Sequence, residues 1–161
     1  MRRVYREHVE AVYGFLTYSV GRDTAEDLTA TTFERVIKHW RKYDAAKASE
    51  RTWILAIARN ALIDHYRRGT ARPTSSLDQH PAIADTLADA ADPLADALSA
   101  DAFASWLAAL SGREREIVAL RYGADLSAAE IAAQLGLSEA NVHQIASRGI
   151  RKLRALADDA K

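Results

Sequence analysis

The stretch Ser127–Arg154, which reads SAAEIAAQLGLSEANVHQIASRGIRKLR, decides the fold because it has the layout of a helix-turn-helix. Ser127 and Glu130 have the spacing of a capping box, so we expect a helix to begin there. Gly136 is the residue type that ends a helix in the left-handed conformation. Ser138 can cap the helix that follows. The sequence therefore predicts two helices joined by a tight corner.

The second of these helices divides into two faces. Apolar and small residues at steps of three and four form one stripe, which consists of Val142, Ile145, Ala146, Gly149, Ile150 and Leu153. The opposite face carries Ala140, His143, Gln144, Ser147, Arg148, Arg151 and Lys152. This pattern is typical of a recognition helix, in which polar groups read base edges and cations bind phosphates. A solvated helix whose cations complement the C-terminal dipole is the alternative interpretation.

The composition favours a helical protein without disulfides. The 161 residues allow one domain or two small ones, and an apolar content of 48% is enough for their cores. Gly and Pro are few, at 7 and 3 residues, which favours helix over strand. The chain has no cysteine, no apolar run of membrane length and no signal-peptide pattern. We therefore expect a cytoplasmic protein that does not insert into a membrane.

The charge is balanced overall but unevenly distributed. Lys and Arg together number 22, as do Asp and Glu. Residues 1–68 hold 13 basic and 9 acidic side chains, whereas residues 69–100 hold 1 and 5. Residues 101–161 hold 8 of each. A zero net charge therefore does not exclude a nucleic-acid partner, because the basic residues cluster locally.

The N-terminal part predicts three amphipathic helices that share one core. The first covers residues 1–20 and ends at Gly21, and the third covers residues 50–68. The second extends to about residue 43 and is expected to begin at a capping box formed by Asp23 and Glu26. Its buried side consists of Leu28, Thr32, Phe33, Val36, Ile37 and Trp40.

The middle of the chain has the composition of a linker. Residues 69–100 contain all three prolines, five aspartates and one arginine. As a flexible coil this segment would span about 30 Å, and about 100 Å when fully extended. A second domain then covers residues 101–161 with four helices, one of which begins at a capping box formed by Ser111 and Glu114. The predicted fold class is all-α, with two small helical domains joined by an acidic flexible linker.

Three segments in this order resemble the extracytoplasmic-function sigma factors of bacterial RNA polymerase. AEDLTATTFERVIKHW at residues 25–40 is similar to the segment of that family that docks on the polymerase. TWILAIARNALIDHYRR at residues 52–68 is similar to the helix that reads and melts the minus-ten element. LSGREREIVALRYGADLSAAEIAAQLGLSEANVHQIASRGIRKLR at residues 110–154 is similar to the domain that binds the minus-thirty-five element.

The resemblance implies three sets of site residues. The set for polymerase binding is Asp27, Leu28, Phe33 and Val36. The set for the minus-ten strand is Lys47 and Ser49, in the loop that captures a flipped base, with Arg59, Asn60, Arg67 and Arg68. The set for the minus-thirty-five duplex is Ser138, Asn141, His143, Gln144, Ser147, Arg148 and Arg151. Ala30 and Thr31 stand where many relatives have Gln and an acid, which puts the polar part of the polymerase contact in question.

The resemblance also implies a function and its partners. The expected protein binds core RNA polymerase, directs promoter recognition and strand opening, and is held inactive by an anti-sigma factor. It needs no cofactor and no metal, and it is not an enzyme, because the five histidines are scattered and no phosphate-binding loop or nucleophile elbow is present. The alternative is an autonomous regulator that uses the same helix-turn-helix to bind DNA without polymerase.

Overall fold

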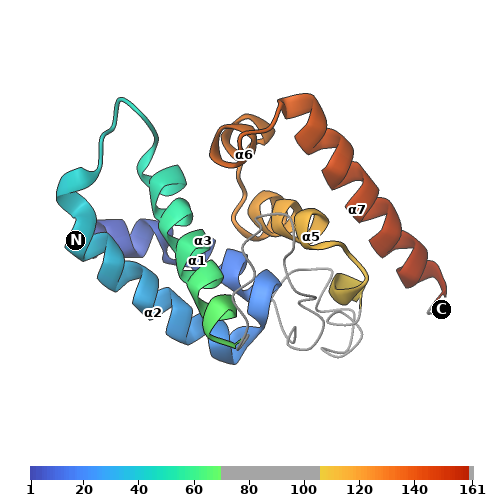
Figure 1. The fold of residues 1–161 in the computed structure, drawn as a ribbon, viewed down its shortest axis with the longest axis horizontal. Coiled ribbons are helices and arrows are strands. Elements are labelled where there is room, and N and C mark those ends of the chain that lie inside the picture. Colours follow the sequence, from blue (N-terminus) through green and yellow to red (C-terminus); the bar gives the residue numbers. More distant parts are fainter. Residues whose placement is uncertain (70–105, 160–161) are drawn as a thin grey trace.

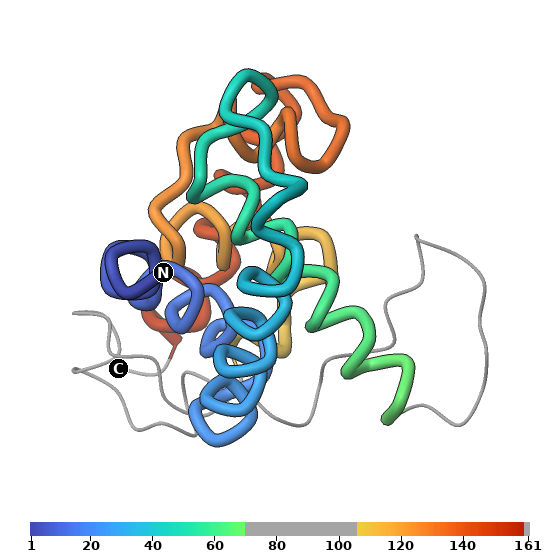
Figure 2. Tube along the Cα trace, turned by 90° about the vertical axis from the view of Figure 1, so that its left-hand side faces the viewer, coloured from blue at the N-terminus to red at the C-terminus, as the bar shows by residue number. Residues whose placement is uncertain are grey.

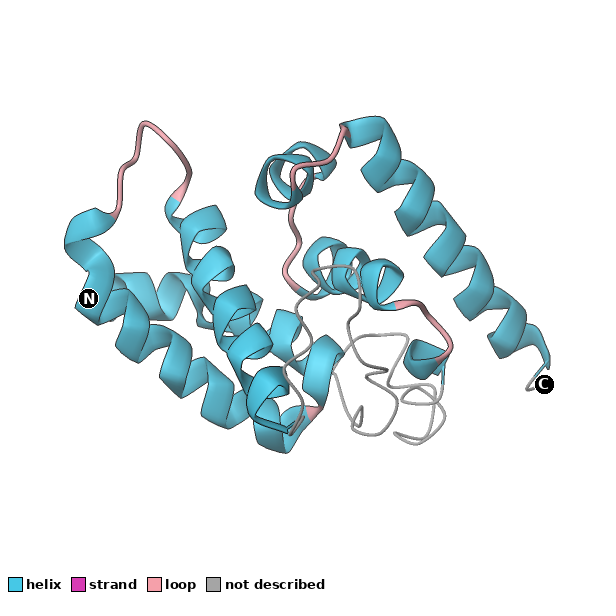
Figure 3. Ribbon diagram, viewed as in Figure 1, coloured by secondary structure: helices cyan, strands magenta, loops and turns pink. Residues whose placement is uncertain are grey.

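The computed structural model describes residues 1–69 and 106–159, and within these two ranges it contains helices, turns and loops but no strand (Figure 3). The elements are α1 (Arg2–Val20), α2 (Arg22–His39), the 3-10 helix η1 (Trp40–Lys42), α3 (Glu50–Gly69), α5 (Gly112–Val118), the π-helical turn η2 (Ala119–Gly123), α6 (Ala128–Leu135) and α7 (Glu139–Asp159). The predicted all-α class is confirmed. The predicted linker, apart from Gly69, and the first residues of the predicted second domain lie outside the described residues.

The first three helices form a bundle in which each packs against the other two (Figure 1). Its centre is filled by side chains with almost no exposure to solvent, among them Phe15, Leu16, Val36, Ile54 and Leu55. These residues recur at helical spacing along their chains, so burying one stripe of each helix closes the core. The bundle places the Tyr43–Ser49 loop, between η1 and α3, at one end.

Two details of the α2 prediction are wrong. No side chain caps α2, because the helix begins at Arg22, one residue before Asp23, so the predicted capping box of Asp23 and Glu26 does not form. Gly21, with φ of 82°, ends α1 and is also the residue from which α2 starts. Ile37, predicted to be buried, is 59% exposed, because its neighbour Val36 takes the core position and turns Ile37 outward.

The local signals in the C-terminal part are confirmed. Both capping boxes form, one from Ser111 and Glu114 and the other from Ser127 and Glu130. Gly136 adopts the left-handed conformation at the end of α6, with φ of 68°. The Oγ of Ser138 accepts a hydrogen bond of 3.1 Å from the amide of Asn141 and so caps α7. These contacts produce the predicted helix-turn-helix from α6 and α7.

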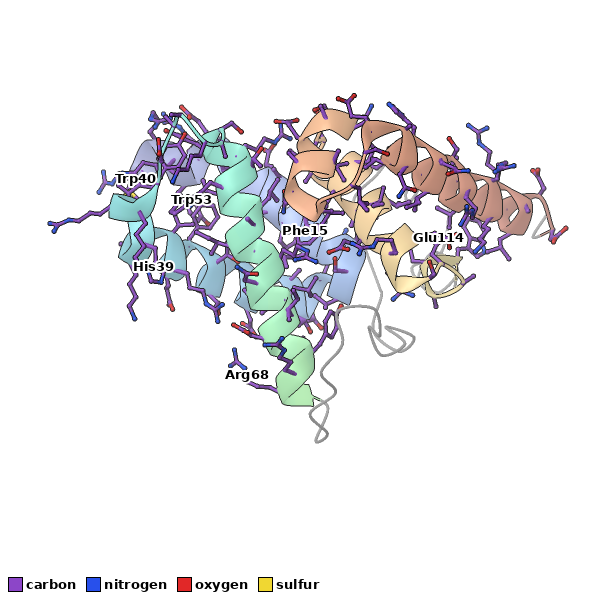
Figure 4. All side chains as sticks on the ribbon, turned by 45° about the horizontal axis from the view of Figure 1, so that its top comes forward. Phe15, His39, Trp40, Trp53, Arg68 and Glu114 are labelled. Atoms are coloured by element: carbon purple, nitrogen blue, oxygen red, sulfur yellow. The ribbon has the colours of Figure 1, made fainter. Side chains whose placement is uncertain are left out.

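The N-terminal bundle and the C-terminal helices are in direct contact (Figure 2). Helix α1 packs on η2 and α5, and α3 packs on α6. Buried apolar residues form one continuous cluster across this contact, which includes Phe15, Leu16, Leu120 and Leu126. Figure 4, in which Phe15 is labelled, shows this residue between the two groups of helices. The division at residues 68 and 101 stays a prediction.

Candidate polymerase and promoter interface

The outward face of α7 presents the predicted minus-thirty-five residues to solvent. His143, Gln144, Ser147, Arg148 and Arg151 are all exposed, whereas Val142, Ala146, Gly149 and Leu153 on the other side are buried. Asn141 is half-buried, and exposed Ser138 is used as the cap of the helix. Polar groups therefore gather on the first half of α7 and arginines follow them, which is the arrangement that base edges and phosphates require.

Helix α7 is held on α5 by an ion pair between Lys152, whose side chain is 45% exposed, and the buried Glu114. The Nζ of Lys152 lies 2.8 Å from the Oε2 of Glu114, and that carboxylate also accepts the Ser111 amide at 2.9 Å. Burial raises the pKa of Glu114, but the Lys152 ammonium and the Ser111 hydrogen bonds outweigh it, so this pKa lies below its ordinary value. These contacts hold α7 on α5 and orient the exposed face.

A buried arginine fixes the chain that leads into α5. The guanidinium of Arg115 is almost fully buried, and it donates to the carbonyl oxygens of Leu107 at 3.0 Å and Leu110 at 3.2 Å. Burial lowers the pKa of Arg115, although an arginine stays protonated near neutral pH. The Leu107 carbonyl also accepts the Leu110 amide at 3.1 Å, so Arg115 adds a second bond there and ties the turn before α5 to the helix itself.

Three aromatic side chains gather beside the Tyr43–Ser49 loop, and the sequence analysis did not identify them as a site. Tyr43 lies with its ring centroid 5.4 Å from those of both Trp40 and Trp53, and the two tryptophans are 5.9 Å apart. All three are half-buried, and Figure 4 shows Trp40 and Trp53 close together below the loop, one on η1 and the other on α3. Their positions in the sequence could have indicated the site, because Trp40, Tyr43 and Trp53 flank one polar loop. We call them the aromatic cluster.

The polar loop next to the aromatic cluster is held by its own hydrogen bonds. The Oδ1 of Asp44 accepts the amide of Ala46 at 2.9 Å, and the hydroxyl of Tyr43 donates to the carbonyl of Ala48 at 3.1 Å. The Oγ of Ser49 accepts the amide of Thr52 at 3.2 Å and so caps α3. Lys47 extends into solvent, with 84% of its side chain exposed. Its Nζ lies 3.9 Å from the Oδ2 of Asp44. The loop is therefore preshaped, and it carries a solvent-exposed cation that is loosely paired within the loop.

The predicted minus-ten residues on α3 do not share one surface. Asn60, Arg67 and Arg68 are exposed, and Arg68 lies near the far end of the helix in Figure 4. Arg59 instead points toward α5, where its Nε lies 2.5 Å from the Oε1 of Glu116. Only 19% of the Arg59 side chain and 11% of the Glu116 side chain are exposed. In this structure Arg59 joins the two groups of helices and is not available to DNA.

Most of the predicted polymerase-binding residues are buried in the bundle. Leu28, Phe33 and Val36 belong to its core, whereas Asp27 is exposed. Phe33 also reaches a shallow apolar depression on the surface, with its ring centroid 4.7 Å from that of Tyr5. The other residues that line this depression are Met1, Arg2, Val4 and Ile37. The outer face of α1 and α2 is thus apolar at one place and acidic at Asp27.

One group of potential metal ligands occurs among the described residues, but a cation already lies there. Glu7, His8 and Glu50 bring their ligand atoms within 4.8 Å of one another. The guanidinium of Arg3 contacts Glu7 at 2.5 Å and Glu50 at 2.8 Å, and the contact with Arg3 lowers the pKa of Glu50. The group is therefore a salt-bridge cluster that ties α1 to the start of α3.

The fold and the exposed face of α7 define a helical DNA-binding protein of the sigma-70 type. Residues 4–72 match the family Sigma-70 region 2, and residues 106–155 match Sigma-70, region 4. The chain belongs to the extracytoplasmic-function (ECF) RNA polymerase sigma factors, which act in promoter recognition and transcription initiation.

Curated relatives agree with this assignment, and a solved structure has the same fold. The chain is 33% identical to the ECF RNA polymerase sigma factor SigC of Mycobacterium tuberculosis over 93% of its own length and 77% of that protein. It is 30% identical to the ECF sigma factor BldN of Streptomyces coelicolor, covering 99% of this chain but only 61% of BldN. The sigma factor RpoE of Bartonella quintana, solved in complex with the anti-sigma factor NepR, has the same fold, with a TM-score of 0.71 at 20% identity over 98% of this chain and 96% of that one.

Within residues 1–69 and 106–159, no helix combines the length and the apolar character needed to cross a bilayer.

Proposed function

We propose that this chain binds core RNA polymerase and grips a promoter at two places, with α7 in the minus-thirty-five duplex and the N-terminal bundle at the minus-ten strand. The observation that carries the proposal is the complete exposure of the polar face of α7 above a buried apolar stripe. A helix with this division can enter the major groove without losing its packing on α5 and α6. Two weak contacts on one chain reinforce each other through effective concentration.

The aromatic cluster gives the minus-ten grip a physical basis. Taking a base out of a duplex costs a few kcal/mol, and stacking on an aromatic ring returns about 1–3 kcal/mol per base. Trp40, Tyr43 and Trp53 offer ring faces beside a loop that carries the exposed cation of Lys47. We assign base capture to this loop and strand-phosphate contacts to Lys47, Arg67 and Arg68. Asn60 and Ser49 complete the polar edge of the surface.

The outer face of α1 and α2 suits a protein partner. Tyr5 and Ile37 expose 50% and 59% of their surface next to Phe33, and Asp27 supplies a charge on the same helix as Ile37. We assign polymerase docking to this face, where Leu28 and Val36 act from beneath by holding α2 in place. The same apolar face would suit an anti-sigma factor, the kind of partner that the RpoE–NepR structure contains.

The proposed mechanism uses binding energy and includes no covalent step. Polymerase supplies the chemistry of RNA synthesis, and this chain supplies position and strand opening. Because core polymerase works in the cytoplasm of bacteria, we propose the same location for this chain. Ala30 is exposed and Thr31 is half-buried on α2, so both lie where a change of side chain could alter docking.

Transcription in vitro tests the proposal. Purified protein is mixed with core RNA polymerase and a library of random DNA, and the templates that yield RNA are sequenced. We expect two enriched elements separated by a constant spacing. No RNA above the level of core polymerase alone would overturn the proposal. Specific gel shifts by the free protein, without any need for polymerase, would instead establish an autonomous regulator.

A further inference from the structure

The two groups of helices meet at an unusually close approach of backbone to backbone. A Cβ atom on Gly14 would lie 2.2 Å from the carbonyl oxygen of Gly123, and a Cβ atom on Gly123 would lie 2.9 Å from that of Gly14. Gly14 belongs to α1, whereas Gly123 is the last residue of η2. Any side chain larger than hydrogen at Gly14 therefore separates the two groups or displaces their backbones.

Space, and not backbone conformation, requires glycine at this contact. Within the described residues, positive φ values at glycine occur at Gly21 and Gly136, so neither Gly14 nor Gly123 needs the freedom that glycine gives. Gly14 lies well inside a helix of 19 residues, where glycine is less favourable than alanine by about 1 kcal/mol. Glycine therefore lowers the stability of α1 at the position where α1 contacts the C-terminal helices.

Polar contacts also join the two groups of helices, and one of them uses Arg59, a residue predicted to bind DNA. The ion pair of Arg59 with Glu116 lies at the boundary between α3 and α5. Arg51 on α3 donates a hydrogen bond to the carbonyl oxygen of Ala124, the residue after Gly123. The Oε2 of Glu116 also accepts a hydrogen bond of 3.1 Å from the Nη1 of Arg113 on the same helix, α5. This bond holds the carboxylate in place. While this fixed carboxylate is paired with Arg59, the guanidinium is not free to bind a phosphate.

The closed arrangement is too small to hold both promoter elements. Their names place them about 25 base pairs apart, which corresponds to about 85 Å along B-DNA. A compact body of the size of residues 1–69 and 106–159 together has a radius of gyration of about 14 Å and is about 35 Å across. The two groups of helices must therefore separate before α7 and the aromatic cluster can bind their elements together.

We propose that the contact between Gly14 and Gly123 is a latch that keeps the free protein closed, with Glu116 occupying Arg59 in place of DNA, and that the latch opens when polymerase and promoter bind. The part that concerns Arg59 and the promoter rests on the proposed function. The closed state of the free protein does not. Because only the open form binds both elements, the apparent affinity falls by the fraction of molecules that are open.

The latch is tested by measuring a distance in solution. The chain has no cysteine, so the double variant Glu26→Cys and Ala155→Cys accepts donor and acceptor dyes at two exposed positions, one on α2 and one on α7. We expect high energy transfer in the free protein and a clear fall after Gly14→Leu, because leucine fits a helix but not this contact. Gly69→Leu is the matched control, since nothing lies within 4 Å of Gly69.

Circular dichroism on the same samples shows whether α1 and the other helices persist in each variant. Low transfer in the unmodified free protein, or transfer that Gly14→Leu leaves unchanged while the helices persist, would overturn the latch. A transcribing complex with core polymerase and promoter should show low transfer, and high transfer there would also overturn it. If Gly14→Leu opens the free protein but no sample initiates transcription, the latch stands and the proposed function fails.

The role of Glu116 has its own test, with a fluorescein-labelled single-stranded 20-mer of mixed sequence as the probe. We expect Glu116→Gln to tighten binding about threefold and to steepen the slope of log K against log salt by about 0.7, the value for one further phosphate contact. Glu34→Gln, an exposed carboxylate on α2, is the matched control for net charge. If affinity and salt slope change equally in both variants, the effect is one of net charge and Glu116 has no role in the latch.

Discussion

The Nζ of Lys152 on α7 lies 2.8 Å from the Oε2 of Glu114, the carboxylate that completes the capping box of α5. The sequence pattern groups Lys152 with the cations of the DNA-binding face, but the structure gives it a structural partner. Arg148 and Arg151 are exposed on the same helix. The positive charges of α7 therefore divide into one that holds the helix in place and others that remain available to DNA.

Lys152→Ala should lower the stability of the fold by about 1–2 kcal/mol, because it leaves the buried Glu114 carboxylate without its cation. Arg151→Ala should leave stability unchanged and weaken binding to all promoters alike. Urea unfolding and binding of the polymerase complex to DNA measure the two effects. Equal stability of the two variants would show that the ion pair contributes nothing in solution.

Acid should destabilise the fold through its capping-box carboxylates. The hydrogen bond from the Ser127 amide lowers the pKa of Glu130 most, and the pKa of Glu114 is lowered as well despite its burial. A carboxyl whose pKa is depressed in the folded state stabilises the fold above its unfolded pKa of about 4.5, and this stability is lost as the pH falls through the folded value. We expect the free energy of unfolding to be flat above about pH 5.5 and to fall below pH 4.5.

Melting curves recorded across that range check this prediction, with Glu114→Gln as the informative variant. It should be less stable than the unmodified chain at pH 7, and the difference should shrink as the pH falls. A difference that is independent of pH would assign the effect of Glu114 to packing instead of charge.

Gly136→Val should destabilise the helix-turn-helix corner by about 1–2 kcal/mol, since a β-branched residue is forced to a φ of 68°. Nothing lies within 4 Å of the Gly136 Cβ position, so the strain is in the backbone and not in a clash. Gly136→Asn is the matched variant, because asparagine tolerates this conformation, and it should retain most of the stability. Thermal melting ranks the three proteins, and an unchanged melting temperature for the valine variant would contradict the geometry.

Arg148→Ala should weaken the preferred minus-thirty-five element by about 1–3 kcal/mol and relax sequence preference at one position if the guanidinium makes a bidentate base contact. Repeating the promoter selection with this variant measures the effect. A uniform loss across all sequences would assign Arg148 to a phosphate.

Tyr43→Ala should reduce strand opening more than it reduces duplex binding, because it removes a ring face from the aromatic cluster. Tyr43→Phe keeps the ring but loses the hydrogen bond to the Ala48 carbonyl, so it should retain most opening. Permanganate footprinting of the melted strand compares the two variants. Full opening by Tyr43→Ala would remove this ring from base capture.

The features that follow from local spacing were predictable from the sequence. The boxes of Ser111 and Ser127, the left-handed Gly136 and the two faces of α7 depend on residues within a few positions of one another, and the structure has all of them. The Asp23 box was wrong for a local reason too, since Gly21 starts α2 earlier than the motif requires. The sequence could not show that the side chains of distant segments meet.

The contacts that join distant segments required the structure. Gly14 and Gly123 are ordinary glycines in the sequence, and only their approach in space gives them a role. Arg59 and Glu116 likewise become partners only when the fold brings their side chains within reach of each other. The aromatic cluster lay between these cases, because its members flank one loop but their mutual contact depends on the packing of α3 on α2.

Gly21 also limits how this protein can change by insertion. One residue separates the end of α1 from the start of α2, so an added residue would move the start of α2 and change how it packs on α1. Such a shift would carry Phe33 away from the ring of Tyr5, whose centroid lies 4.7 Å from its own. Related chains should therefore keep a single residue at this joint.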